Sequence, residues 1–325
     1  MLPDYWDDLA GNNPYLKKRI LLLIEETHDC GQRYHVVHDN GPCAIFVTSR
    51  TKFEAAIPVK KNLSVPVTVT GIPVPVSLSG HSITNREYGR FIDAVTGLEG
   101  LKLIVQAREE LYHPALMRIR NIPCYYLDQK FASFDDYTGA MRSPYRRRIK
   151  QAVKRCRDIN TVVLKDNNAF DRRMYDLYTS VYENARYRTG RINIDLFRKM
   201  PVRTYRFDLN QTAVGFIQTL PNGPELLFFK GGMDPSCDRG PDLYFFMLLT
   251  VIRQGIEEGF ERVCFGQTGD DTKLRLGCRP EPRYIYLSHS NRTVHSLLSR
   301  HPRTRPEKTH LPRYRVFRNS QPVSS

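Results

Sequence analysis

The groups best suited to chemistry gather in one stretch near the C-terminus, FGQTGDDTKLRLGCRPEPRYIYL at residues 265–287. It sets Asp270 and Asp271 side by side, shortly before Lys273. A carboxylate can accept a proton from a nucleophile, and an ammonium group can stabilise negative charge that develops in a transition state. The structural alternative is a helix start, where adjacent acids favour the helix dipole and the lysine lies on the surface. On the functional interpretation, strand, turn and helix here form the wall of a substrate cleft.

A second set of candidates lies in LLFFKGGMD at 226–234 and the helix that follows. Gly231 and Gly232 would let a ligand approach the strand backbone closely, and Lys230 would add a cation, whereas the structural alternative is a plain strand-end turn. Tyr244 could donate a proton to a leaving group, although buried tyrosines are more often structural.

Two residues farther from these segments are candidates for binding an acceptor. Glu183 and Arg186 are one helical turn apart, and could equally form only an i,i+3 ion pair. The histidines lack metal-ligand spacing, so we expect no metal site. The P-loop, HExxH and GxSxG motifs are absent from the sequence, as is a glycine-rich dinucleotide loop.

The charge of the chain is concentrated in its second part. The formal net charge is +15, and residues 1–128 are neutral overall. Residues 142–157, RSPYRRRIKQAVKRCR, hold eight basic residues and no acid, and residues 292–318 hold eight against Glu307 alone. Such an excess favours a polyanionic ligand, nucleic acid or a phosphate-rich molecule, over the alternative of a solvated face and a basic tail. Arg146, Arg147 and Lys150 of the first run are candidate donor-binding residues.

Cellular context follows from cysteine usage and hydropathy. The seven cysteines are scattered, without a C-x-x-C pair, as in a protein with reduced thiols. The N-terminus lacks the pattern of a signal peptide, and the longest apolar run, ILLLI at 20–24, is too short to cross a bilayer. We therefore expect a cytoplasmic protein without a membrane span; the oligomeric state is left open.

The elements that must position these groups follow one another in two similar series. In the first part the patterns predict a β-hairpin over 34–59, an edge-prone strand from 63, a helix over 85–98, and strands over 102–107 and 122–129. In the second part they predict a basic helix from Ser143 with an apolar stripe of Tyr145, Ile149, Ala152, Val153 and Cys156, then a helix over 170–188. Three strands over 202–234, a buried helix over 242–260 ending at Gly259 and a strand over 262–266 follow.

This order predicts an α+β protein with two tandem modules. We expect a degenerate module at 1–130, a catalytic module at 131–290 and a basic, mostly irregular tail at 291–325. The tail is expected to be dispensable for folding, with RYRVF as a candidate edge strand.

Four local patterns in the second part resemble the GNAT acyltransferase superfamily, and more closely its Fem-like aminoacyltransferase and BioF2-like acetyltransferase branch. They are SPYRRRIKQAVKR, LYTSVYENARYRTGRINIDLFRKM, AVGFIQTL with LLFFKGGMD, and FGQTGDDTKLRLGCRPEPRYIYL. The resemblance implies mixed, mainly antiparallel sheets flanked by helices, with splayed central strands whose free backbone amides hold the acyl arm. It also implies that Lys273 and Gly277 correspond to the Fem-like Lys-x-x-x-Gly signature.

One departure from the superfamily concerns the loop that cradles the pyrophosphate of coenzyme A. Here that loop is DPSCDRGPDLYFF, in which Arg239 could contact a phosphate but Pro241 lacks an N–H group. We therefore expect an aminoacyl group to pass from aminoacyl-tRNA to an amine acceptor, forming an amide, with no tightly bound cofactor. The alternatives are an acyl-CoA or carrier-protein thioester as donor, or a non-catalytic module that binds RNA or phosphate.

Overall fold

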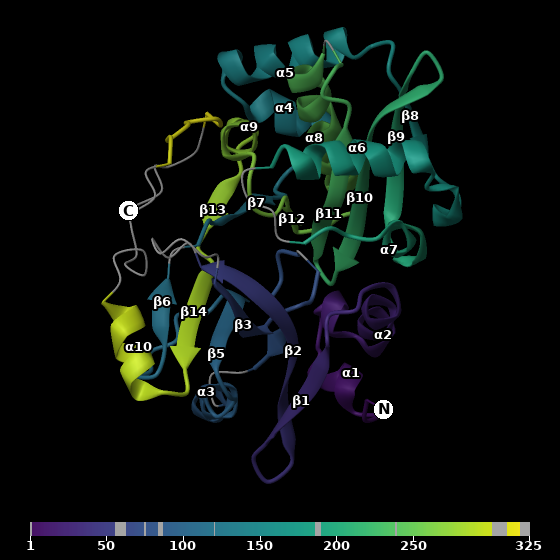
Figure 1. Ribbon diagram of the computed structural model, residues 1–325. Helices are drawn as coiled ribbons and strands as arrows, with labels where there is room; N and C mark the ends of the chain where they lie inside the picture. Colours follow the sequence, from purple (N-terminus) through teal and green to yellow (C-terminus); the bar gives the residue numbers. More distant parts are fainter. Residues whose placement is uncertain are drawn as a thin grey trace. The chain divides into compact units, whose positions relative to one another are not determined.

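The computed structural model describes residues 2–55, 63–74, 76–83, 87–119, 121–185, 190–237, 239–300 and 311–318 (Figure 1). The chain divides into two compact units. The first contains Met1–Ile122 and Pro282–Thr309, and the second contains Pro123–Glu281 and His310–Ser325. Each unit is an α+β module with its own mixed sheet, as the order of elements predicted. The boundaries differ from those expected, because the chain returns to the first unit after residue 281 and to the second after residue 309.

The first unit is built on the sheet β1-β2-β3-β5-β14-β6, with β4 paired to β2. Its strands are β1 (Arg33–His38), β2 (Pro42–Ala55), β3 (Leu63–Thr70), β4 (His81–Ser82), β5 (Leu101–Ala107), β6 (Met117–Ile119) and β14 (Tyr284–His289). Its helices are α1 (Trp6–Leu9), η1 (Pro14–Leu16), α2 (Lys18–Thr27), α3 (Tyr88–Thr96) and α10 (Arg292–Ser299). Phe91, Ile92 and Val95 of α3 pack on Phe46 and Ile104 of the sheet, which forms the core of this unit.

The predicted hairpin of the first unit is confirmed, with its turn at Asn40 and Gly41. The following strand, β3, is not an edge strand as expected. It pairs antiparallel with β2 and parallel with β5, and Pro66 is tolerated opposite Lys52 within that ladder. The prolines suggested an edge strand, but here they do not indicate where the strand lies in the sheet.

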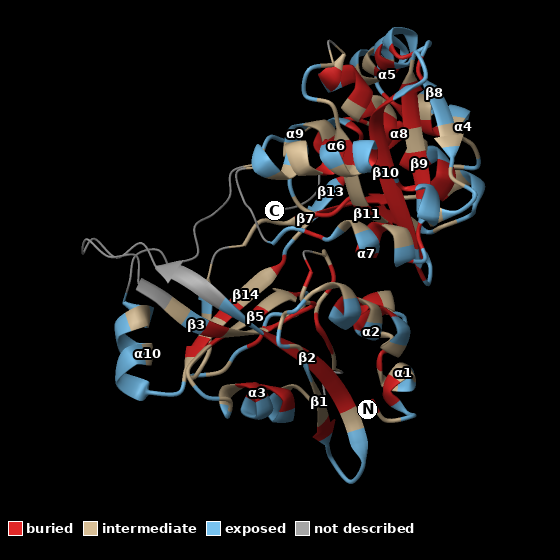
Figure 2. Cartoon of the chain, turned by 45° about the vertical axis from the view of Figure 1, so that its right-hand side comes forward, coloured by how far each residue is buried: buried red, intermediate tan, exposed pale blue. Residues whose placement is uncertain are grey.

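The second unit is built on the sheet β13-β7-β12-β11-β10-β9-β8. Its strands are β7 (Cys124–Asp128), β8 (Asn160–Val163), β9 (Arg203–Leu209), β10 (Thr212–Asn222), β11 (Glu225–Met233), β12 (Arg262–Cys264) and β13 (Arg279–Glu281). Its helices are α4 (Phe134–Ala140), α5 (Ser143–Arg155), η2 (Asn167–Ala169), α6 (Arg172–Glu183), α7 (Ile194–Lys199), α8 (Gly240–Glu257) and α9 (Asp270–Arg275). Figure 2 shows that β10 and much of α8 are buried.

Helices cover both faces of this second sheet. On one face, α5 and α8 pack through the core that includes Ile149, Leu248 and Ile217. On the other, the rings of Phe197 in α7 and Phe216 in β10 are 5.9 Å apart, and α6 lies against β11. Helix α8 ends as predicted, with Gly259 in a left-handed conformation (φ +72°) just beyond its C-terminal turn.

Each sheet contains one strand from a segment that was expected to belong to the other module. Strand β7 was expected to close the first module, but it lies in the second sheet between β12 and β13. Strand β14 was expected in the second module, but it lies in the first sheet between β5 and β6. An apolar strand satisfies its backbone equally well in either sheet, so its sequence pattern does not indicate which one it joins.

The apolar stripe of α5 is confirmed except at one position. Ile149, Ala152 and Cys156 are buried and Tyr145 packs against them, but Val153 is 43% exposed. None of the seven cysteines, all of which lie in the described residues, forms a disulfide.

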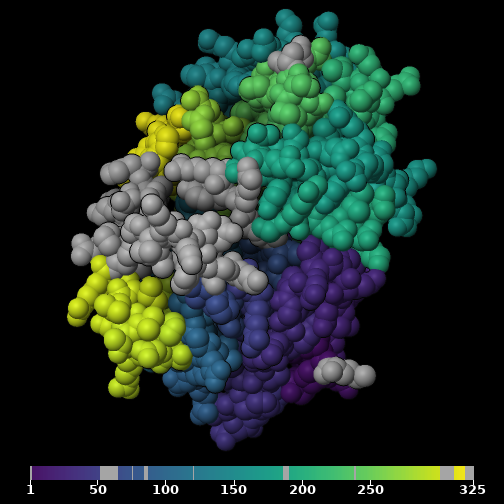
Figure 3. All heavy atoms as spheres, viewed as in Figure 1, coloured from purple at the N-terminus to yellow at the C-terminus, as the bar shows by residue number. Residues whose placement is uncertain are grey.

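The described end of the tail packs against the second unit, which the sequence did not indicate. Val316 is buried, the Phe317 ring packs against Phe131 and Tyr137, and the Arg142 N–H donates to the Val316 carbonyl oxygen at 2.9 Å. Figure 3 shows the yellow residues of this segment beside atoms of the second unit. The candidate edge strand RYRVF is reduced to one isolated bridge, between Met141 and Phe317.

Candidate functional site

The central strands of the second sheet diverge, as the resemblance implied. Strand β11 pairs with β10 as far as Met233, but its parallel ladder with β12 covers only Glu225–Leu227 against Arg262–Cys264. After Cys264 the chain turns to β7, where the Phe265 N–H donates to the Tyr125 carbonyl oxygen at 2.8 Å. Within the described ladders, the edge of β11 from residue 228 onward therefore has no strand partner on this side. Its backbone groups are suited to hydrogen-bond an extended acyl arm.

A bulge reorients β11 at the start of this free edge. Gln218 is opposite Lys230, whereas the next residue, Thr219, is opposite Phe228, which leaves Phe229 as the extra residue. A bulge reverses which side chains face each side of the sheet. Lys230 is half-buried on this strand, and burial lowers its pKa to about 8.

The two glycines of β11 have packing reasons that the sequence did not indicate. A Cβ on Gly232 would lie 2.5 Å from the backbone nitrogen of Tyr178 in α6. A Cβ on Gly231 would lie 2.9 Å from the Phe228 ring and 3.1 Å from the Phe216 carbonyl oxygen. Glycine at 232 therefore permits the close approach of α6, and the expected role in admitting a ligand is not needed to explain it.

Lys273 was expected on the surface or at a cleft wall, but it lies in the interior of the second unit, where it is 2% exposed. Its Nζ donates to the backbone carbonyl oxygens of Phe265 at 2.8 Å, Gly266 at 3.3 Å and Gln267 at 2.9 Å. Burial lowers its pKa to about 8. The lysine thus holds the turn between β12 and α9.

The two acids that precede Lys273 have different surroundings. Asp271 forms an ion pair with Arg275 at 2.7 Å and accepts a hydrogen bond from the Tyr314 hydroxyl at 2.5 Å. These bonds hold the pKa of Asp271 below its usual value, so it is poorly suited to be a base. Asp270 is half-buried. Burial of the Tyr125 and Tyr244 hydroxyls is the main cause of their raised pKa, and the negative charge of Asp270 raises the pKa of both further.

Tyr244 lies close to the same turn. A Cβ on Gly269 would be 2.7 Å from its hydroxyl, and Gly269 is left-handed (φ +70°) at the start of α9. The hydroxyl of Tyr125 is fully enclosed. Tyr125 was not among the sequence candidates, because a Tyr-Tyr pair in an apolar strand looks like ordinary core. Asp270, Tyr244 and Tyr125 are therefore the groups near this turn that could exchange a proton.

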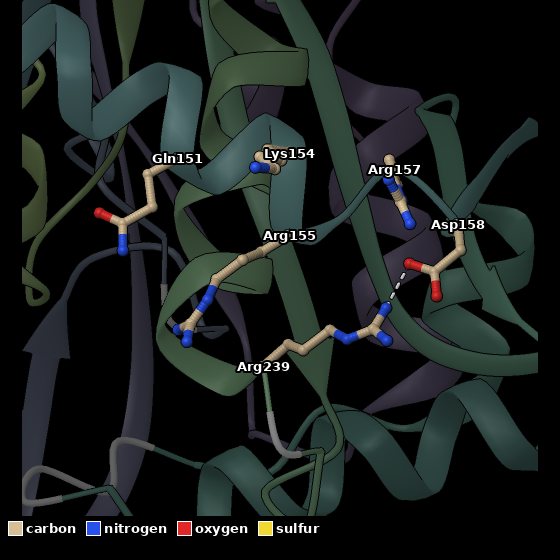
Figure 4. Close-up of a pocket in the computed structure, with 6 residues that line it drawn as sticks. All are labelled: Gln151, Lys154, Arg155, Arg157, Asp158 and Arg239. Atoms are coloured by element: carbon tan, nitrogen blue, oxygen red, sulfur yellow. Dashed lines mark hydrogen bonds and ion pairs between the residues drawn. The ribbon is translucent and has the colours of Figure 1, made fainter.

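A cationic hollow of about 520 Å³ lies where α5 ends and α8 begins (Figure 4). Its lining consists of Gln151, Lys154, Arg155, Arg157, Asp158 and Arg239. Figure 4 shows the long side chains of Arg155 and Arg239 extending across it, with Arg239 paired to Asp158. Four cations against one acid at a helix N-terminus favour an anion.

Asp242 joins the two helices that form this hollow. It is 4% exposed and accepts hydrogen bonds from Arg148 at 2.5 Å and Arg155 at 2.8 Å. Burial alone would raise the pKa of Asp242, but these two guanidinium groups hold it below its usual value. No pattern in the sequence indicates this contact, since Arg148 and Arg155 lie 94 and 87 residues from Asp242.

The other predicted binding residues do not line the hollow. Arg146 donates to the Gly139 carbonyl oxygen at 3.5 Å, while Arg147 and Lys150 are exposed on α5. Glu183 is exposed at the end of α6, and Arg186 lies outside the described residues. Arg239 is the predicted donor-binding residue that the hollow contains.

Exposed cations of α5 form a row that continues from the hollow. Arg147, Lys150 and Lys154 are exposed, and their spacing of three and four residues puts them on one side of α5, while Arg157, also exposed, lies two residues beyond the end of the helix. Among the described residues none of the four forms an ion pair. We call these four residues the basic row. At 1.5 Å per residue its helical part, from Arg147 to Lys154, is about 10 Å long.

No group of His, Cys, Asp and Glu side chains among the described residues could hold a metal ion. None of the described helices is both long enough and apolar enough to cross a bilayer.

Comparison with known proteins gives a family for part of the chain. Residues 141–274 match the model of the acetyltransferase (GNAT) domain. No curated protein matches the chain.

Solved structures share the fold over most of the chain. FemX is 10% identical, with 92% of this chain and 99% of FemX covered and a TM-score of 0.56. The C-terminal domain (DUF2156) of a protein assigned as a lysylphosphatidylglycerol synthetase, from Agrobacterium fabrum, is 10% identical, with 91% and 93% covered and a TM-score of 0.56. The L-PGS of Bacillus licheniformis is 13% identical, with 87% and 96% covered and a TM-score of 0.53.

Proposed function

We propose that this chain, whose residues 141–274 match the acetyltransferase (GNAT) domain, transfers an aminoacyl group from aminoacyl-tRNA to an amine acceptor. The neighbours named FemX and L-PGS, which share the fold, favour this choice within the superfamily. The product is an amide, so the amine loses a proton and the tRNA leaves with its terminal hydroxyl restored. We propose that this takes place in the cytoplasm.

The basic row is the observation that carries the choice of donor. A pyrophosphate is served by one cationic pocket, whereas a row of exposed cations that extends about 10 Å along α5 and continues to Arg157 beyond it suits a ligand with phosphates in succession. The row also reaches the hollow at the start of α8, so a bound strand would be directed toward the second unit's diverging strands. Pro241 in the first turn of α8 removes one N–H group from the anion-binding end of that helix.

Within the site we propose roles for the chain's own groups. The free edge of β11 would hold the aminoacyl arm, and backbone N–H groups there would bind the carbonyl oxygen as it becomes negative. Asp270 would take the proton of the attacking amine, and Tyr244 would return a proton to the leaving oxygen. Lys273 would support these groups by fixing the turn on which Asp270 begins α9.

A binding experiment tests the donor. Filter binding of deacylated tRNA to the full chain should weaken in Lys154→Gln, and the salt dependence should become flatter by roughly one unit of slope per lost phosphate contact. Lys165→Gln is a matched control, because Lys165 is also an exposed lysine of the second unit and lies outside the row. Equal tRNA binding by both variants would remove the basic row from the donor site.

Acyl-CoA is the alternative donor, favoured by the cationic hollow itself. Arg155 and Arg239 span a space that could hold a pyrophosphate without any contribution from the rest of the row. On that alternative, coenzyme A binds with high affinity, Arg239→Gln weakens it, and Lys150→Gln has no effect. A chain that binds tRNA but transfers nothing from either donor would instead be a non-catalytic binding module.

A further inference from the structure

The first unit contains a cationic hollow of its own, of about 280 Å³, on the sheet face that carries α3. It is bordered by β1, β2 and β3 and by the residues that follow α3. Its polar lining consists of Arg33, His35, Thr48, Arg50, Thr68 and Glu99. The proposed acyl transfer uses none of these residues.

Strand register brings the two arginines of this hollow together. Arg33 is opposite Thr48, and Arg50 is opposite Thr68, so Arg33 and Arg50 are diagonal neighbours on adjacent strands. Diagonal neighbours on one face are about 7–8 Å apart, within reach of long side chains. His35 shares this face, with its Nε2 2.8 Å from the Thr48 hydroxyl.

Both arginines are exposed at the mouth of the hollow. Among the described residues, neither guanidinium group forms a hydrogen bond or an ion pair, and Glu99 is the single acid of the lining. Two like charges at diagonal positions on neighbouring strands repel each other. An oxyanion between them would remove the repulsion and receive paired N–H donors from each planar guanidinium.

A third cation lies beneath the hollow and removes an obstacle to anion binding. The C-terminal end of α3 carries partial negative charge, which alone would repel an anion. Lys102, which is opposite Thr68 and 1% exposed, donates to the carbonyl oxygens of Thr96 at 2.8 Å and Leu98 at 2.6 Å. Its ammonium group therefore offsets the negative end of α3 next to the hollow.

We infer that this hollow is a binding site for the phosphate group of a small molecule. Two planar guanidinium groups and the hydroxyls of Thr48 and Thr68 match the acceptors of a tetrahedral oxyanion. The end of α3 bounds the site on one side, which suits a compact ligand better than a continuous nucleic-acid backbone. The inference rests on the first unit alone and stands whether or not the chain transfers an aminoacyl group.

The imidazole of His35 provides a local reporter for the test. Inorganic phosphate is titrated into the full chain while the His35 ring resonances are followed by NMR, assigned by comparison with His35→Gln. A saturable shift is expected with phosphate, and no saturable shift with acetate at the same ionic strength. Binding at the cationic hollow of the second unit does not interfere, because His35 belongs to the first unit.

Variants then attribute the binding to the two arginines. Arg33→Gln and Arg50→Gln should each raise the dissociation constant for phosphate by about tenfold, since each removes a charge-assisted contact. Arg19→Gln, an exposed arginine of the same unit, should leave it unchanged. The melting temperatures of both pocket variants should be equal to or above that of the wild type, because like-charge repulsion is relieved.

Four results would overturn the inference. One is the absence of a saturable His35 shift with phosphate, and another is equal affinity in all three arginine variants. The third is displacement of phosphate from His35 by deacylated tRNA, which would make the hollow a nucleic-acid contact. A fall of several degrees in the melting temperature of Arg33→Gln would likewise assign that arginine to the fold and not to a ligand.

Discussion

Lys273 Nζ and the backbone carbonyl oxygen of Phe265 are 2.8 Å apart in the interior of the second unit. Two further carbonyl oxygens, of Gly266 and Gln267, accept from the same ammonium group. Lys273 thus closes the turn that follows β12, where the central strands have diverged. Its position makes it a residue of the fold, and in our proposal it supports the site through the turn it holds.

We predict that Lys273→Ala destabilises the protein by about 3 kcal/mol, because it takes the donor from the buried Phe265 carbonyl oxygen, removes one donor each from Gly266 and Gln267, and leaves a cavity in the interior. This differs from the expectation for a cleft-wall lysine, whose loss would scarcely change the melting temperature. Urea unfolding measures the effect. A melting temperature like that of the wild type would place Lys273 outside the interior.

The charge of Lys273 predicts a pH dependence. Burial lowers its pKa to about 8 from the ordinary 10.5, so between these values the unfolded chain binds more protons than the folded one. Stability then rises with pH. The free energy of unfolding of wild type minus that of Lys273→Met should increase by about 2–3 kcal/mol from pH 7 to pH 10. A difference that stays constant over this range would show that Lys273 titrates as an ordinary surface lysine.

The C-terminal segment predicts a sharp dependence on chain length. A chain that ends at residue 318 keeps Val316 and Phe317, whereas one that ends at residue 310 loses both. We expect the shorter chain to be less stable by about 3 kcal/mol or more, since burying a large apolar side chain contributes about 1.5–3 kcal/mol. Calorimetry of the two chains measures this difference. Equal melting temperatures would show that the segment containing Val316 and Phe317 does not stabilise the fold.

A substitution at Gly277 tests the packing of Phe317 at the residue that its ring contacts. Its φ is +88°, and a Cβ there would lie 2.4 Å from the Phe317 ring. Gly277→Ala should therefore destabilise the full chain, and by a smaller amount the chain that ends at residue 310, where only the backbone strain remains. If the cost is the same in both chains, the ring of Phe317 does not pack on Gly277.

The contacts of Asp242 lead to a prediction about how α5 and α8, the two helices at the cationic hollow of the second unit, are held together. Asp242→Asn should cost about 2–4 kcal/mol, because Arg148 and Arg155 lose a buried carboxylate. Its depressed pKa means that its stabilisation is present above the unfolded value of 3.8 and is lost as the pH falls below it. The wild type and Asp242→Asn should therefore differ in urea unfolding at pH 7 and converge toward pH 3; a constant difference would contradict the ion pairs.

The sequence predicted the local elements of the second unit well, because strong periodicity and turn residues decide them. The three strands from Arg203 to Met233 and the end of α8 before Gly259 are examples. It could not predict the exchange of β7 and β14, since pairing partners are chosen by tertiary contacts. The α+β class with tandem modules was therefore predictable, and the residues that complete each sheet were not.

The candidate site was predictable in its segments and less so in its residues. Arg239 lies in the cationic hollow, but Lys154, Arg155 and Arg157 were seen in the sequence only as part of a basic run. Which face of a helix is filled by a neighbour, and which remains exposed, depends on contacts such as Asp242 with Arg155. The interior position of Lys273 was hidden for a related reason, because a lysine rarely enters a core unless several carbonyl groups converge on it.

Transfer of label from aminoacyl-tRNA tests the proposed function most directly. Unfractionated ¹⁴C-aminoacyl-tRNA is incubated with the full chain and a small-molecule cell extract as the source of acceptor, and parallel reactions use ¹⁴C-acetyl-CoA. We predict that label moves from aminoacyl-tRNA into an alkali-stable amide, more slowly with Lys154→Gln and at the wild-type rate with Lys165→Gln. Transfer from acetyl-CoA with none from aminoacyl-tRNA would contradict the choice of donor.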